Sequence, residues 1–151
     1  MKKLWNLAFG YFLAAMAGGV FYREFTKYFG FTGETALGYL HVHLLVLGTV
    51  LFLFLGLAAK STDLLEKKQF HTFVTVYNII LPLFTVVMLV RGILQATGVS
   101  VSHGADAAIS GIAGLTHIAI AGAWIFLFTI LRKLKSVSYT HLRAHETRRH
   151  L

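Results

Sequence analysis

The feature that most constrains this chain is an uncharged stretch of 25 residues, from Thr35 to Ala59, that contains two histidines. An α-helix rises 1.5 Å per residue, so about 20 apolar residues cross the hydrocarbon core of a bilayer. The stretch is therefore long enough to span a membrane. Ionisable side chains inside such a span are rare and costly, which makes His41 and His43 candidates for a functional site.

The rest of the chain repeats this apolar pattern. Hydrophobic residues make up 56% of the sequence, too many for a water-soluble domain of this size. We predict an all-α fold, an integral membrane bundle of four antiparallel transmembrane helices in a single domain over residues 1–135. The predicted spans cover about residues 4–28, 35–59, 70–97 and 105–131. A signal peptide at the start is disfavoured, because the apolar run continues past its small-residue triplet.

Residues 136–151 break abruptly from this pattern. Their sequence, SVSYTHLRAHETRRHL, matches one reading frame of a transposase-type sequencing adapter. We identify it as a non-native tail, exclude it from the fold prediction, and expect the natural chain to differ beyond about Lys135.

The basic residues predict the orientation in the membrane. Most of those outside the tail flank one side of the predicted spans, and only Arg23 and Lys27 flank the other. Because lysine and arginine concentrate in cytoplasmic flanks, we expect cytoplasmic N- and C-termini. The basic residues form no patch, so the net charge of +8 does not indicate nucleic-acid binding. The residues on the basic side are Lys2, Lys3, Lys60, Lys67, Lys68, Arg132, Lys133 and Lys135.

Several polar residues converge in the outer half of the predicted bundle. His41 and His43 lie about 9 to 12 Å, and His117 about 18 Å, below the outer ends of their helices, while Arg91 lies about 9 Å from the outer end of its own. Imidazole is a common ligand of metals and haem iron. Our leading hypothesis is a haem b or transition-metal site that uses His41 and His117, with His43 as a substitute and Met88 as a soft ligand. Arg91 would pair with a haem propionate, and the role would be redox chemistry, gas sensing or cofactor handling.

Simpler interpretations stand beside this one. Small residues on the second and fourth helices fit close helix packing without any ligand, and Arg91 can form a structural ion pair with Glu24 or Glu34. The alternative function is a non-catalytic transport or accessory subunit whose histidines are structural or relay protons. A pure packing scaffold also stays open, as does a homo-oligomer or a larger membrane complex. No motif of a hydrolase is present, so a non-enzymatic role is favoured.

Three stretches resemble a known family. VFYREFTKYFGFTGETALGYLHVHLLVLG (20–48), YNIILPLFTVVMLVRGILQ (77–95) and DAAISGIAGLTH (106–117) resemble short bacterial membrane proteins catalogued as domain-of-unknown-function family 2871. The resemblance implies a four-helix membrane architecture, a location in a bacterial inner (plasma) membrane, and no particular activity. The segment LHVHLLVLG is also similar to histidine-bearing helices of haem-copper oxidases and of nitric-oxide-response membrane proteins, which points toward haem or metal.

Overall fold

The computed structural model describes residues 1–136, so the predicted non-native tail lies outside the described residues except for Ser136. The described part is helical, and its four long helices differ from the predicted spans by at most two residues at either end. In order, the elements are α1 (Lys2–Tyr28), α2 (Leu37–His43), the π-helical η1 (Leu44–Val50), α3 (Leu51–Ser61), the short η2 (Leu64–Glu66), α4 (Lys68–Thr97) and α5 (His103–Leu131).

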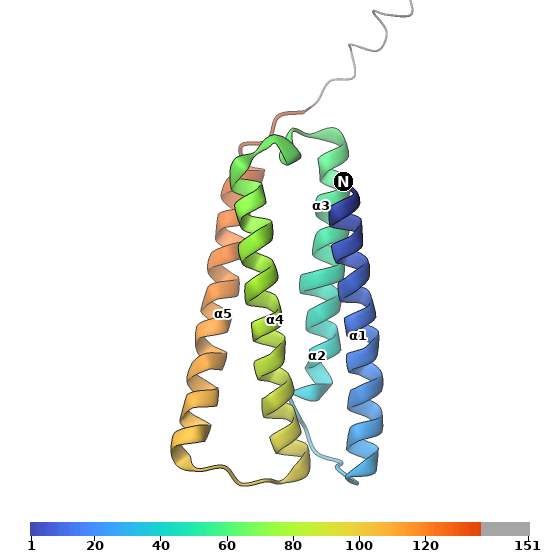
Figure 1. The fold of residues 1–151 in the computed structure, drawn as a ribbon, viewed down its shortest axis with the longest axis vertical. Helices are drawn as coiled ribbons and strands as arrows, with labels where there is room; N and C mark the ends of the chain where they lie inside the picture. Colours follow the sequence, from blue (N-terminus) through green and yellow to red (C-terminus); the bar gives the residue numbers. More distant parts are fainter. Residues whose placement is uncertain (137–151) are drawn as a thin grey trace, which may run out of the picture.

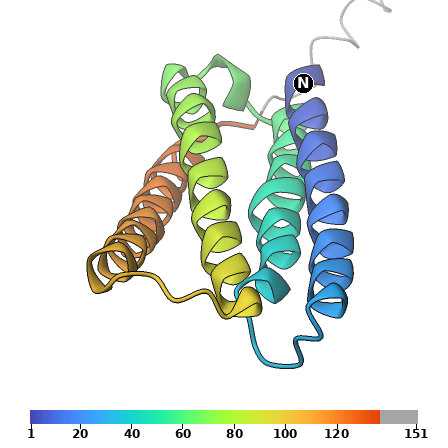
Figure 2. The same ribbon diagram turned by 60° about the horizontal axis from the view of Figure 1, so that its bottom comes forward.

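The helices form an elongated bundle in which successive long helices run in opposite directions (Figures 1 and 2). Elements α2, η1 and α3 form one continuous helix, which packs against α1 and, near its start, against α4. Helix α5 packs chiefly against α4. The N-terminus, the α3–α4 connection and the end of α5 share one end of the bundle, whereas the α4–α5 connection lies at the other (Figure 1).

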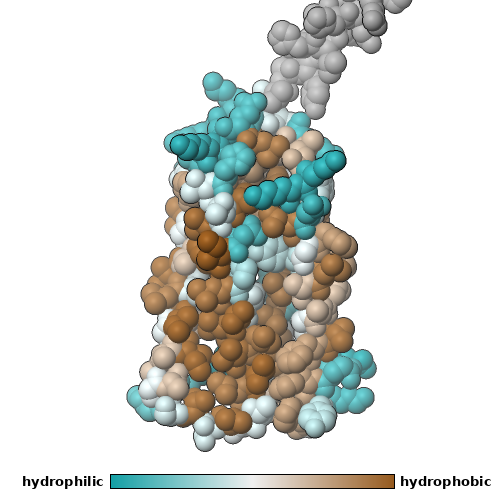
Figure 3. Space-filling view, viewed as in Figure 1, coloured by the Kyte–Doolittle hydropathy of each residue, from teal (hydrophilic) through white to brown (hydrophobic). Residues whose placement is uncertain are grey.

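All four long helices are long and apolar enough to cross a membrane. Brown apolar side chains cover the middle of the face in Figure 3, and teal polar side chains gather near both ends. This distribution matches a bilayer, which presents a hydrocarbon layer between two polar interfaces. The predicted all-α, four-helix membrane architecture is thereby confirmed.

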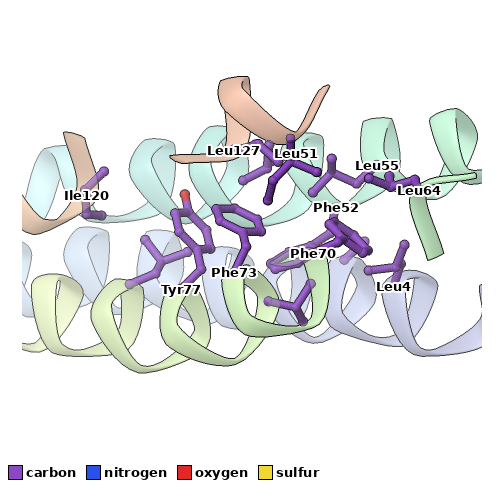
Figure 4. Close-up of a cluster of buried hydrophobic side chains, with 14 of the residues drawn as sticks. Leu4, Leu51, Phe52, Leu55, Leu64, Phe70, Phe73, Tyr77, Ile120 and Leu127 are labelled. Carbon is purple, nitrogen blue, oxygen red and sulfur yellow. The ribbon is translucent and has the colours of Figure 1, made fainter. Parts of the chain in front are cut away.

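The packed core lies mainly in the half of the bundle that holds the N-terminus. Its largest fully buried side chains include Phe52, Phe70, Phe73 and Tyr77, whose rings lie between the helices in Figure 4. A smaller buried cluster of Ala15, Leu40 and Leu44 continues the core toward the opposite half. The opposite half therefore has fewer bulky groups between its helices; His41 and His43 lie in it, and His117 lies at the middle of α5.

The π-helical segment η1 is held by hydrogen bonds from other helices. The Tyr77 hydroxyl donates to the backbone oxygen of Leu47 over 2.9 Å, and the Trp124 indole N–H donates to the Tyr77 oxygen over 3.3 Å. A π-helix leaves some backbone groups without their usual partners, and π-bulges are frequent at functional sites. Here the hydroxyl of Tyr77 satisfies a carbonyl of the distorted segment directly after His43.

Candidate functional site

His41 occupies the seam between α1 and α2. A Cβ atom built on Gly19 of α1 would lie 3.6 Å from Cγ of the half-buried imidazole, an ordinary van der Waals distance, so the ring packs directly against α1 at this glycine. The Nδ1 atom of His41 is buried and makes no hydrogen bond within residues 1–136. His41 therefore faces a neighbouring helix, and that helix is α1.

His43 and His117 both contact one buried aromatic ring. The ring centroid of Phe84, on α4, is 5.3 Å from that of His43 and 4.7 Å from that of His117. The contact with His117 is edge-to-face, with an interplanar angle of 82°. Phe84 is only 2% exposed. The structure thus brings imidazoles from the second and fourth transmembrane helices to one level, and the pair contains His43 rather than His41.

Both imidazoles have a defined tautomer. The Nδ1 atom of His43 lies 2.8 Å from the backbone oxygen of Tyr39, and Nδ1 of His117 lies 2.7 Å from that of Ala113. A carbonyl oxygen only accepts, so each Nδ1 carries the hydrogen and donates it. In a neutral imidazole the lone pair then resides on Nε2. Metal-binding histidines commonly use this arrangement, with one nitrogen donating to a backbone carbonyl and the other free to coordinate.

A cavity of about 210 Å³ lies beside His117, between α4 and α5. Met88, Arg91 and His117 all line it, so three of the five predicted cofactor residues share one space. Phe84 and Thr116 form part of the wall, whereas His43 contacts Phe84 without lining the cavity.

Arg91 is held by α5 rather than by the predicted glutamates. Its guanidinium donates to the Asp106 carboxylate over 2.5 Å and also to the Ser110 hydroxyl. Glu24 instead pairs with Arg23 over 3.2 Å. Glu34 lies in the exposed loop before α2.

The predicted pair of Arg91 with Glu24 or Glu34 is therefore corrected to Arg91–Asp106. Asp106 is in the first turn of α5 and is not among the partners that the sequence analysis considers for Arg91. One sequence signal could have indicated the contact of Arg91 with α5. Successive spacings of three or four residues put four side chains on one face of that helix: Asp106, Ser110, Ala113 and His117.

The arrangement limits which cofactor can be held. Within residues 1–136, no three histidine, cysteine, aspartate or glutamate side chains gather as metal ligands do. His41 packs against α1 at Gly19, whereas His117 lines the α4–α5 cavity, so the described contacts do not bring these two imidazoles together. The cavity is also smaller than the roughly 300 to 1,000 Å³ usual for organic ligands. Its donor set, one imidazole and one thioether, suits a single soft or borderline metal ion.

The comparisons with known proteins give a family and no activity. A family model described as "Protein of unknown function (DUF2871)" matches residues 1–134. No curated protein and no solved structure matched the chain. Because the match covers nearly the whole of the bundle, and because the described helices are those of a four-helix membrane protein, this chain belongs to the DUF2871 family.

Proposed function

We propose that this integral membrane protein binds one transition-metal ion in the α4–α5 cavity, through Nε2 of His117 and the thioether sulfur of Met88. The observation that carries the proposal is that both side chains line the same small cavity, while the bond from His117 Nδ1 to Ala113 leaves Nε2 free to coordinate. Thioether ligands select Cu(I), and imidazole is an accepted copper ligand. Cu(I) is therefore the ion that we assign.

The surroundings favour the ion over haem. The cavity of about 210 Å³ suits a small guest, and its walls are largely apolar apart from the two donors and Arg91. The guanidinium is already engaged by Asp106, which leaves it a structural role beside the site instead of the predicted role on a propionate. We assign the protein a function in holding or transferring a metal within the membrane, a form of cofactor handling.

Copper binding tests the proposal directly. The purified protein is loaded with Cu(I) under a reductant, competed with a Cu(I) chelator, and assayed for bound copper by mass spectrometry. We expect His117→Ala and Met88→Leu each to lower the affinity about tenfold or more, as losses around metal sites commonly do. Matched controls are His71→Ala and Met16→Leu, which alter the same residue types away from the cavity.

The outcomes separate the alternatives. Equal affinity in the cavity variants and their controls would overturn the proposal. A Soret absorption band in the isolated protein that disappears in His117→Ala would instead establish the haem version. Substitution of His43 by alanine gives a further comparison, because its imidazole contacts the same Phe84 ring as that of His117 but does not line the cavity.

A second function, that of a non-catalytic accessory or transport subunit with structural histidines, is favoured by the packing of Phe84. Its buried ring contacts both imidazoles, as structural side chains do. In that case His117→Ala would lower the stability of the bundle without changing its metal content.

A further inference from the structure

A second cavity lies at the end of the bundle that holds the N-terminus, far along the α4–α5 seam from the proposed metal site. It has a volume of about 300 Å³ and lies between the beginning of α4 and the end of α5. Its lining combines two lysines, two neutral polar side chains and two hydrophobic ones. These residues are Lys67, Gln69, Phe126, Thr129, Ile130 and Lys133.

The two lysines differ in their partners. The Lys67 ammonium lies 2.6 Å from the Asp63 carboxylate, so its charge is largely matched within the chain. The side chain of Lys133 is exposed and forms no ion pair within residues 1–136. The cavity therefore has a net positive rim, and Lys133 supplies the charge that is open to a ligand.

The hydrophobic part of the lining lies on the bundle side of the charged part. Along α5, Lys133 follows Ile130 and Phe126 by about one and two helical turns, so the lining changes from charged to apolar toward the middle of the membrane-spanning helix. Ile130 is buried, whereas Phe126 is 37% exposed. Such a gradient matches a molecule with a charged head and a hydrocarbon tail.

The location fits the same type of molecule. Polar side chains gather at this end in Figure 3, where the bundle meets the membrane interface. Basic pockets between transmembrane helices at the cytoplasmic side are sites where anionic lipid headgroups bind. A soluble phosphate ester would use the lysine but would gain nothing from Phe126 and Ile130.

We propose that this cavity binds an anionic phospholipid, with its phosphate group at Lys133, its polar headgroup near Gln69 and Thr129, and an acyl chain along the α4–α5 seam over Phe126. The site is independent of the metal proposal, because the two cavities share no lining residue.

Lipid retention by the intact protein tests this site. The protein in neutral detergent is titrated with phosphatidylglycerol, and bound lipid is counted by native mass spectrometry, with phosphatidylcholine as the uncharged comparison. We expect Lys133→Gln to weaken phosphatidylglycerol binding about fivefold, the effect of one interfacial cation. The matched control is Arg132→Gln, which removes a neighbouring exposed charge outside the cavity.

Each outcome decides the question. A selective loss in Lys133→Gln, with phosphatidylcholine binding unchanged, supports the site. Equal losses of phosphatidylglycerol binding in both variants would mean that only the general positive charge of this end attracts the lipid. That result would overturn the proposed site. Soluble glycerol phosphate that binds as tightly as phosphatidylglycerol would overturn the lipid as occupant. Thermal unfolding of both variants verifies that the bundle is intact.

Discussion

Gly92 shows how strongly a single position near the candidate site is constrained. A Cβ atom there would lie 2.5 Å from the backbone nitrogen of Leu37, and backbone cannot rotate away as a side chain tip can. The oxygen of Gly92 also accepts a hydrogen bond of 2.8 Å from the buried Thr35 hydroxyl. This close approach joins the start of α2 to α4, one residue from Arg91.

We therefore expect Gly92→Ala to reduce the free energy of unfolding by about 1 to 3 kcal/mol, the usual cost of overpacking. Gly111→Ala is the control, because a Cβ atom at that helical position meets nothing within 4 Å. It should leave the stability unchanged or slightly higher, since alanine favours helix. Unfolding in mixed detergent micelles measures both variants, and equal stabilities would contradict the contact.

The Asp63 carboxylate makes the stability of the bundle depend on pH. The hydrogen bond from Lys67, assisted by one from the Lys135 backbone N–H, holds the pKa of Asp63 below its usual value. A lowered folded-state pKa gives stability that is present above the unfolded-state pKa and is lost as the pH falls through the folded-state value. The contribution is thus complete above about pH 3.9 and disappears below it.

We expect wild type to be more stable than Asp63→Asn at neutral pH, with a difference that closes as the pH falls below about 3.9. Unfolding midpoints measured from neutral to acid pH for both proteins report this difference. A gap that stays constant over the whole range would contradict the role of the ionised carboxylate.

Among the elements, the second transmembrane helix departs most from a regular form. Its π-helical part receives a hydrogen bond from Tyr77, whose hydroxyl donates to the Leu47 oxygen and accepts from Trp124. Hydrogen bonds between membrane helices contribute about 0.6 kcal/mol on average and up to about 1.7. Tyr77→Phe should lower the free energy of unfolding by an amount in this range, whereas Tyr39→Phe, at a side chain that is 57% exposed, should have little effect.

A second readout connects this element to the site. If η1 regains regular helical bonds when the hydroxyl is lost, the residues after His43 change their rotation about the helix axis. Hydrogen exchange of the η1 amides in Tyr77→Phe measures the change. Exchange identical to wild type would show that the π-helix does not depend on this hydroxyl.

The sequence predicted the elements better than their contacts. Hydropathy alone predicted the four spans, because a bilayer demands a long apolar helix whatever its neighbours are. It could not predict η1, whose partner Tyr77 is 30 residues from Leu47 along the chain. The same limit explains the wrong partner for Arg91: a helical wheel gives the face of a side chain, but the tilt and rotation of the facing helix decide that Asp106 meets it.

The site was predicted in part for the same reason. Rarity of polar groups in lipid singled out Arg91 and His117, and helical spacing placed Met88 near Arg91. The choice between His41 and His43 depended on which helix each faces. In the structure His41 lies against α1 at Gly19, and His43 lies against Phe84 on α4.

At the scale of the whole molecule, the two halves of the bundle differ in packing and in charge. Bulky aromatic residues fill the half with the N-terminus, while His41 and His43 lie in the other half and the cavity beside His117 begins near the middle of α5. Eight lysines and arginines flank the spans at the first end, and two at the second. Because the two ends of the bundle differ in basic charge, we expect the positive-inside rule to put them on different sides of the membrane.

The orientation can be tested cleanly because the chain has no cysteine. Single cysteines are introduced by Gly104→Cys, where a Cβ atom meets nothing within 4 Å, and by Ser61→Cys, an exposed position at the opposite end. The positive-inside rule predicts that an impermeant maleimide added to intact spheroplasts labels only the first. Both should react after the membrane is opened with detergent. Labelling of Ser61→Cys alone would show that the orientation is opposite to the predicted one. The proposed metal cavity would then lie near the cytoplasmic side and the lipid cavity in the outer leaflet.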